Sequence, residues 1–386
     1  MHPFDEITVE QLRAAGSTKW TLFPDSIGAF IAEMDFGVPP EVADVVREAA
    51  DTRAMGYLPA AERTAARRAT AQWLGRSFDW HLPEGNVFLL PDVLSGLRIA
   101  IQRFTPPGSP VIVPTPAYMP FLTVIPAQDR EVVEVPSLLD ADGRYRLDLD
   151  GIDAAFAAGA GLLVLCNPWN PVGRVLTREE LTDLAAVVDR HGGRVFADEI
   201  HAPLLLDEVP HVPYASLDAR TAGHTITAVA ASKGWNVPGL KCGQMVLSND
   251  ADVAAFAPYA TDAGDTVGLL GARAAIAAYT HGQGWLDDVV GYLRGNRDLL
   301  AELVAEIPGI RLSPVEGTYI AWLDCRELDL PGGPARFFRR EAGVALTDGT
   351  TCGTAGEGFA RLIFAMPRPI LRQALEQMRD AVLARA

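Results

Sequence analysis

Three apolar runs of the chain are each followed by polar side chains that can do chemistry. Asn170 lies in 167-NPWNPVGR, Asp198 begins 198-DEIH, and Lys233 lies in 232-SKGWNVPGLKCG. An amine can act as a nucleophile or base, while a carboxylate and an amide bind cations and polar groups. Ligands of doubly wound folds bind beyond the carboxyl ends of the strands. The three segments therefore predict one ligand site.

Each segment alone is weak, because an ordinary alternative exists for each. An Asn-Pro pair is usually a turn, an Asp after a strand is usually a helix cap, and a lone Lys is usually solvated. Their order and spacing together are specific.

The elements that must hold these residues are short apolar runs separated by helical segments. The runs are 87-VFLL, 111-VIV, 131-EVVEV, 162-LLVLC, 195-VFA, 225-TITAVA and 245-MVL. Runs that are apolar on both faces and alternate with helices predict a parallel sheet covered on both sides. Helices are also predicted from near Glu41, over 61-AERTAARRATAQWLGR, and over 177-TREELTDLAAVVDRHGG, which has Thr, Glu and Gly at cap positions.

The pattern changes after about residue 265. Two long helical patterns run to Glu306, followed by strand-like 319-YIAWLDC, a helix near 334-PARFFRREAG, strand-like 361-RLIFAM and a terminal helix from Ile370. We therefore predict three parts: an N-terminal segment (1–45) that joins the small domain, a large domain (46–280) and a small α+β domain (281–386).

Composition excludes several classes. The 386 residues carry 33 Lys and Arg against 49 Asp and Glu, a formal charge of −16. Such a chain is not expected to bind nucleic acid or anionic membranes. No signal peptide, transmembrane run or metal-binding cysteine cluster is apparent, and four scattered cysteines fit reduced thiols in the cytoplasm.

The chain resembles pyridoxal-phosphate (PLP) enzymes of the aspartate-aminotransferase fold over essentially its full length. Within that superfamily it is most similar to the cystathionine β-lyase or C–S lyase branch. The motifs that carry this likeness are 18-TKW, 31-IAEMDF, 56-GY, 116-PAYMPF, 198-DEIH, 316-EGTYIAWLD and 361-RLIFAMPR. The resemblance implies a large α/β PLP-binding domain with a mostly parallel seven-stranded sheet, and a small α+β domain.

The resemblance also implies roles at the cofactor ring. Lys233 matches the lysine that forms a Schiff base with the cofactor aldehyde and moves the α-proton. Asp198 matches the partner of the ring nitrogen, and Asn170 the partner of the phenolic oxygen. His201 is expected near that oxygen, with an ordinary core or loop histidine as the alternative. Tyr118 is expected to stack on the ring, with simple packing as the alternative.

At the phosphate the signal is weaker. The start of 91-PDVLSGL offers the backbone amides of Val93 and Leu94. Lys241 stands where many relatives have an arginine, and it lacks the bidentate fork. Ala230 replaces the usual hydroxyl, for which Ser232 is a candidate substitute.

Substrate contacts are implied as well. Arg361 matches the arginine that binds a substrate α-carboxylate; an ordinary strand-start arginine is the alternative. Tyr57 matches a tyrosine that reaches the neighbouring subunit's phosphate, which implies a homodimer with composite sites. Glu33 and Met34 are candidates for contact with the substrate side chain.

These implications leave three functions open. The first is a C–S β-lyase that cleaves cystathionine or another cysteine S-conjugate, and the second is an aminotransferase. The third, a PLP-binding regulator without turnover, is disfavoured by the complete set of Lys233, Asp198, Asn170 and Arg361. All cofactor residues are shared, so only the branch resemblance favours the lyase.

Overall fold

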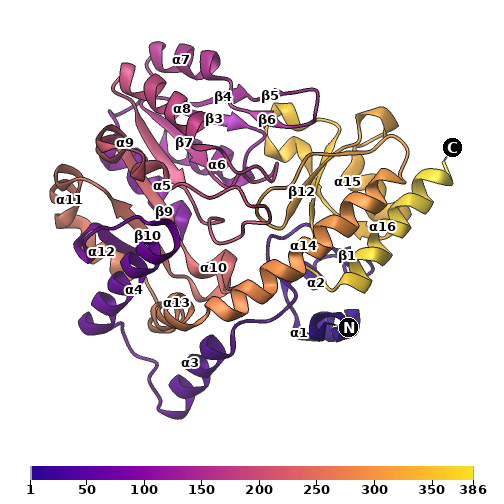
Figure 1. The fold of residues 1–386 in the computed structure, drawn as a ribbon, viewed down its shortest axis with the longest axis horizontal. Coiled ribbons are helices and arrows are strands. Elements are labelled where there is room, and N and C mark those ends of the chain that lie inside the picture. The colour runs from indigo at the N-terminus through magenta and orange to yellow at the C-terminus, as the bar shows by residue number, and fades with distance from the viewer. Residues whose placement is uncertain (1, 386) are drawn as a thin grey trace.

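A seven-stranded sheet forms the centre of the computed structural model, which describes residues 2–385 (Figure 1). Its strand order is β2-β10-β9-β8-β7-β3-β4, and only β10 runs antiparallel to its two neighbours. The predicted mostly parallel sheet of seven strands is confirmed. The strands are β2 (Val87–Leu90), β3 (Val111–Thr115), β4 (Val132–Pro136), β7 (Leu162–Cys166), β8 (Arg194–Asp198), β9 (Thr225–Val229) and β10 (Gly243–Leu247).

Burial explains why these runs become strands. Every residue of β2, β3, β7, β9 and β10 is buried, as expected for strands covered on both faces. The edge strand β4 is more exposed. All seven apolar runs of the sequence coincide with these strands.

Helices surround the sheet and continue into the C-terminal third. They are α1 (Val9–Ala15), α2 (Thr18–Thr21), α3 (Pro40–Asp51), α4 (Ala60–Phe78), α5 (Val93–Phe104), α6 (Met119–Val124), α7 (Leu149–Ala157), α8 (Arg178–Arg190), α9 (Ala219–His224), α10 (Ala231–Gly234), α11 (Asp250–Phe256), α12 (Ala260–Asp265), α13 (Leu269–His281), α14 (Gln283–Ala305), α15 (Pro334–Phe337) and α16 (Arg368–Leu383). Thr177 and Glu180 form the predicted capping box of α8, and Gly192 follows its end with a positive φ of 60°.

A second, antiparallel sheet lies in the C-terminal third, beside α14 and α16 (Figure 1). Its order is β11 (Arg311–Leu312), β12 (Ile320–Asp324), β15 (Phe359–Ile363) and β14 (Thr347–Asp348). Short pairs join β5 (Leu138–Leu139) to β6 (Tyr145–Arg146), and β1 (Ile27–Gly28) to β13 (Val344–Ala345).

The N-terminal segment contacts this C-terminal third. The amide of Ile27 donates to the carbonyl of Gly343 (2.8 Å), and that of Asp35 donates to Ala365 (3.1 Å). These bonds, with the pairing of β1 and β13, attach residues 27–35 to the C-terminal third. The exact division at residues 45 and 280 stays a prediction.

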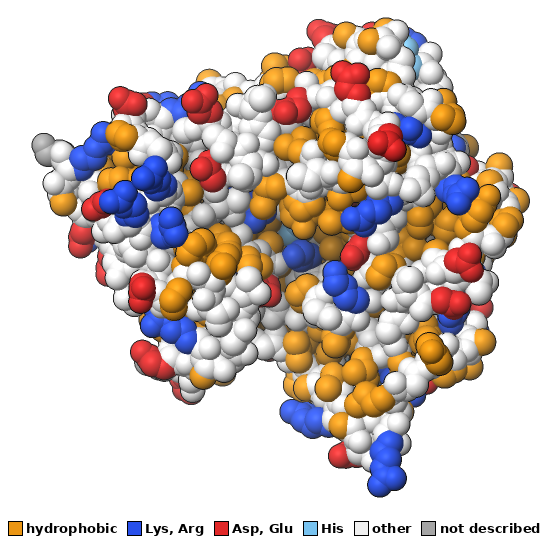
Figure 2. Space-filling view, turned by 180° about the vertical axis from the view of Figure 1, so that it is seen from behind, with side chains coloured by type: hydrophobic (Ala, Val, Ile, Leu, Met, Phe, Trp, Pro, Cys, Tyr) orange, Lys and Arg blue, Asp and Glu red, His pale blue; other side chains and the backbone are white. Residues whose placement is uncertain are grey.

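The surface mixes charges of both signs. On the face in Figure 2, basic side chains lie among acidic and hydrophobic ones, and several lie beside a hollow near the centre. No helix within residues 2–385 is long and apolar enough to cross a membrane. The four cysteines are unpaired; Cys166, Cys325 and Cys352 are buried and Cys242 is half-buried.

Candidate active site

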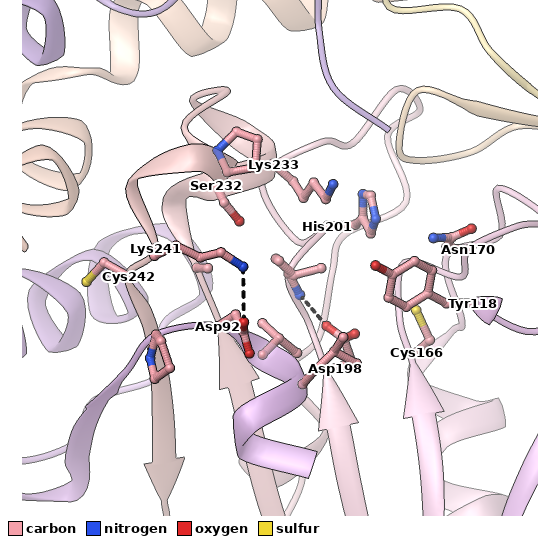
Figure 3. A pocket seen from close by; sticks show the side chains of 16 residues that line it. Asp92, Tyr118, Cys166, Asn170, Asp198, His201, Ser232, Lys233, Lys241 and Cys242 are labelled. Carbon is pink, nitrogen blue, oxygen red and sulfur yellow. Dashed lines mark hydrogen bonds and ion pairs between the residues drawn. The ribbon is translucent and has the colours of Figure 1, made fainter. Parts of the chain in front are cut away.

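A cavity opens at the carboxyl ends of the central strands and brings most of the predicted residues together (Figure 3). Parallel strands place their carboxyl ends at one sheet edge, so loops far apart in the sequence meet there. The cavity is lined by the predicted Val93, Leu94, Tyr118, Asn170, Asp198, His201, Ser232, Lys233 and Lys241, and also by Pro91, Asp92, Cys166, Ile200, Ala230, Pro238 and Cys242.

Asp198 is the last residue of β8 and is buried at the base of this cavity. One carboxylate oxygen accepts the amide of Ile200 (3.1 Å). Burial raises the pKa of Asp198 to about 7, since the backbone hydrogen bond and the more distant Lys233 compensate it only in part. Within residues 2–385 no cation forms an ion pair with this carboxylate. It is therefore poised to pair with a protonated nitrogen.

Lys233 enters the cavity from the short helix α10. Its amine donates to the carbonyl of Ala32 (2.5 Å), and its side chain points toward His201 (Figure 3). Burial, followed by the charge of Arg361, lowers the pKa of Lys233 to about 8. About a fifth of the amine is thus neutral, and able to accept a proton, at pH 7.4.

His201 and Tyr118 flank the cavity on the side of Asn170 (Figure 3). Burial and the charges of Lys233 and Arg361 hold the pKa of His201 well below its usual range, so the ring is neutral. Its Nδ1 atom is buried without a hydrogen-bond partner among the described residues. Tyr118 follows β3 at the start of α6, with its ring half-buried against the cavity. Burial raises the pKa of Tyr118.

Asn170, in the loop after β7, and Arg361, in β15 of the second sheet, meet beside the cavity. A guanidinium nitrogen of Arg361 donates to Oδ1 of Asn170 (3.1 Å). The other donates to the carbonyl of Phe30 (2.8 Å) and to Oγ1 of Thr347 (3.2 Å). Arg361 is buried, yet it pairs with no carboxylate in the described part of the chain. A buried cation of this kind fits a carboxylate ligand.

The opposite end of the cavity offers donors for an anion. Asp92 caps α5 by accepting the amide of Ser95 (2.9 Å). Val93 and Leu94, the first two residues of that helix, have amides without intrahelical partners. Lys241 lines the same end and pairs with Asp92 (3.2 Å; Figure 3). Ser232 lies close by on α10.

Comparisons with known proteins agree with this geometry. Residues 28–378 match the family described as aminotransferase class I and II. The chain is 36% identical to the cystathionine beta-lyase of Corynebacterium glutamicum over 374 residues, which cover 96% of this chain and 98% of that protein. These matches decide the family.

The chain belongs to the class I and II aminotransferase family. Solved structures support this: a candidate PLP-dependent β-cystathionase of Corynebacterium diphtheriae shares 37% identity, with a TM-score of 0.92 and 98% of both chains covered. Cystalysin of Treponema denticola, whose structure contains a PLP cofactor, shares 26% identity with a TM-score of 0.91 over 100% of both chains.

The cavity of this family member fits PLP. Asp198 is a buried carboxylate without a cation, His201 has an unsatisfied ring nitrogen, and the start of α5 has free amides. A protonated ring nitrogen, a phenolic oxygen and a phosphate would satisfy these groups in turn. Lys233 lies among them with an amine of lowered pKa.

Arg361 bonds to Asn170 beside this cavity without lining it, and three further predicted residues do not line it either. Tyr57, between α3 and α4, is 98% exposed. Met34 is buried within the hydrophobic core, and Glu33 is half-buried with Oε1 lacking a partner among residues 2–385. None of the three lines the cavity formed by the other predicted residues. Their contact with substrate stays a prediction.

The structure adds groups that sequence reasoning missed. The hydroxyl of buried Tyr319 donates to the carbonyl of Ala32 (3.1 Å), the same atom that receives Lys233. Buried Arg174 pairs with Glu316 (3.0 Å), which joins the loop after β7 to the segment before β12. Tyr319 and Glu316 both stand in 316-EGTYIAWLD, so the motif was visible but these contacts were not.

Arg361→Lys should raise KM for an amino-acid substrate by about tenfold to a hundredfold, with a smaller change in kcat. The reason is that lysine cannot hold a carboxylate with two parallel hydrogen bonds, and each charged bond contributes roughly 1.5–3 kcal/mol. Steady-state kinetics measures this. Arg311→Lys, an exposed position in the same sheet, is the control and should leave KM unchanged. An unchanged KM in Arg361→Lys would remove Arg361 from the substrate site.

Proposed function

We propose that this protein is a PLP-dependent C–S β-lyase. It cleaves cystathionine or another cysteine S-conjugate, with one water, to a thiol, pyruvate and ammonia. The observation that carries the proposal is the full-length similarity to the cystathionine beta-lyase of C. glutamicum, joined to a cavity with Lys233 and Asp198 in place.

The residues of the site have different roles in this reaction. Bound PLP supplies an aldehyde carbon for amines and a ring that withdraws electrons from the substrate Cα. Arg361 and Asn170 hold the substrate carboxylate, which fixes the Cα–H bond relative to Lys233. Lys233 accepts the α-proton as a neutral amine and, once protonated, can donate to the departing sulfur. Asp198, ionised, holds a proton on the ring nitrogen throughout.

An aminotransferase is the alternative, because the family includes such enzymes and the same residues hold the cofactor in both. It differs in where Lys233 returns the proton. In the lyase, the Cβ–S bond breaks instead, and no keto-acid co-substrate is consumed.

One assay separates these two functions. The purified holoenzyme is incubated with cystathionine or S-alkyl cysteines without any keto acid, and pyruvate and free thiol are measured. The lyase releases both in equal amounts. Keto-acid-dependent amino transfer without pyruvate from any thioether would reject the lyase and support the aminotransferase. Stable cofactor binding with neither activity would support the regulator.

The proposal includes a homodimer with composite sites. Tyr57 and Met55, in the loop between α3 and α4, are 98% and 58% exposed in the single chain. Large apolar side chains on a projecting loop favour a protein partner. In the proposed dimer, Tyr57 reaches the phosphate end of the partner's cavity. The three-part domain division and a cytoplasmic location complete the proposal, the latter supported by the unpaired cysteines.

Mixing two inactive variants tests the composite site. Tyr57→Ala and Lys233→Ala homodimers should each be weakly active or inactive. Random exchange makes half the dimers mixed, and each mixed dimer has one intact site. The mixture should therefore regain about a quarter of the wild-type activity. No recovery after verified subunit exchange would place Tyr57 outside the partner's site.

A further inference from the structure

A buried polar network lies beneath the loop that contacts Lys233. The amine of Lys19 pairs with Asp35 (2.8 Å), and the indole of Trp20 donates to the other oxygen of Asp35 (2.8 Å). The Lys19 side chain is 0% exposed and that of Asp35 is 4% exposed. These three residues line no part of the cavity, so the roles derived above do not involve them.

The network fixes the backbone of the loop 31–36. The amine of Lys19 also donates to the carbonyl of Glu33 (3.2 Å). The preceding carbonyl, that of Ala32, accepts both the amine of Lys233 (2.5 Å) and the hydroxyl of Tyr319 (3.1 Å). One peptide unit therefore separates the atom held by Lys19 from the atom that holds Lys233.

The other side of the loop is tied to the segment of Lys233 itself. Oδ1 of Asn236 accepts the amide of Met34 (2.9 Å), and its Nδ2 donates to the carbonyls of Met34 (2.9 Å) and Gly37 (2.8 Å). Asn236 stands three residues after Lys233. The loop is thus held between α2 and the segment that follows α10, with the carbonyl of Ala32 on the edge that faces the catalytic amine.

We propose that Lys19, Trp20 and Asp35 are positioning residues for Lys233. They hold the carbonyl of Ala32 where it accepts a hydrogen bond from the free lysine amine, and so orient that amine toward the cavity. This inference rests on the proposed role of Lys233.

Physical reasoning favours positioning over simple stabilisation. A buried ion pair is seldom more stabilising than apolar residues of similar volume, because both charges lose their hydration. Its hydrogen bonds are directional, however, and a satisfied buried network defines one backbone geometry. Misplacing a reacting group by about 1 Å can reduce a rate by about a hundredfold. The main effect of the network is therefore to fix the position of the carbonyl of Ala32.

The test uses the neutral variant Lys19→Met/Asp35→Asn. The amide oxygen introduced at position 35 can still accept from Trp20, so no buried charge is left alone while the Lys19 bond to the loop is lost. In wild-type protein stripped of cofactor, PLP capture should rise with pH as Lys233 loses its proton. A carbonyl acceptor stabilises the charged amine. The variant's midpoint should therefore lie lower by about half a pH unit, and its kcat should fall at least about tenfold with KM nearly unchanged.

The matched control is Arg194→Met/Asp252→Asn, which removes a partly buried ion pair at the other end of β8. It should leave the capture midpoint and kcat unchanged. Trp20→Phe keeps both charges, so it should lower the capture midpoint and kcat by less than the double variant does. It tests the proposal even if the double variant does not fold.

Wild-type capture and turnover in the Lys19→Met/Asp35→Asn variant would overturn the proposal and leave the network a structural one. The capture midpoint needs no thioether cleavage. If the wild-type protein released no pyruvate and the variant's capture midpoint still shifted, the lyase function would be rejected and the positioning role would be retained.

Discussion

Lys233→Ala should reduce pyruvate release from thioether substrates by at least about a thousandfold. The amine of Lys233 is the basic group that the structure places at the cavity with a pKa lowered to about 8. At pH 8 about half of it is neutral, so it can accept the α-proton without a further base. His201 is too weak a base to replace Lys233 at neutral pH, because the pKa of His201 is held well below its usual range.

Single-turnover measurement of pyruvate, with the variant saturated in PLP, checks this prediction. Lys241→Ala is the matched control, since Lys241 lines the same cavity but its side chain is 62% exposed and pairs with Asp92. It should weaken cofactor binding and recover most activity at saturating PLP. A small added amine should partly restore Lys233→Ala. Activity within tenfold of wild type would assign proton transfer to another group.

The sheet was predictable because its strands obey one local rule. A run buried on both faces must be predominantly apolar, and β2, β3, β7, β9 and β10 are fully buried with only Thr115, Thr225, Thr227 and Gln244 as polar residues. Strand direction has no such signal. The antiparallel course of β10 depends on how the chain returns from β9, through α10 and the turn that carries Lys241.

The site was predictable where a side chain follows a strand. Asn170 and Lys233 follow β7 and β9, Asp198 ends β8, and the sheet brings all three to one cavity. The carbonyl of Ala32 was not predictable, because any residue has a carbonyl and its role depends on the fold. The Lys19–Asp35 pair was equally hidden, since burial alone distinguishes it from surface charges.

Met34 shows a limit of predicting side-chain roles from the sequence. Its place in 31-IAEMDF predicts substrate contact, its side chain packs in the hydrophobic core of the single chain, and the contact stays a prediction. The sequence pattern marked the loop as important without showing which of its atoms face the cavity. In the structure, backbone carbonyls of Phe30 and Ala32 make the contacts to Arg361 and Lys233.

Asp198→Asn should stabilise the cofactor-free protein while reducing lyase activity by at least about a hundredfold. Burial raises the folded-state pKa of Asp198 from 3.8 to about 7. Below pH 3.8 Asp198 is mostly protonated in both the folded and the unfolded state, so its raised pKa does not lower the stability of the fold there. As the pH rises toward 7, the unfolded state ionises first, and the folded state loses stability relative to it.

The size of this effect follows from the shift. About three pKa units at 1.36 kcal/mol each correspond to roughly 4 kcal/mol at most, fully expressed above pH 7. Thermal unfolding of cofactor-free protein at pH 5 and pH 8 measures it. Wild type should be less stable at pH 8, and Asp198→Asn should lose that part of the pH dependence. Glu199→Gln, at the neighbouring buried carboxylate, is the control and should retain most of it, because the charge of Glu199 is the smallest cause of the raised pKa of Asp198.

Activity should change in the opposite direction. A neutral amide cannot hold a proton on the ring nitrogen of PLP, so the cofactor withdraws electrons less strongly from Cα. The loss should appear in kcat and persist at saturating PLP and substrate. Asp198 is then a residue whose burial destabilises the empty fold and whose charge is neutralised by the cofactor it binds. An Asp198→Asn variant with wild-type kcat would show that the ring nitrogen needs no anionic partner here.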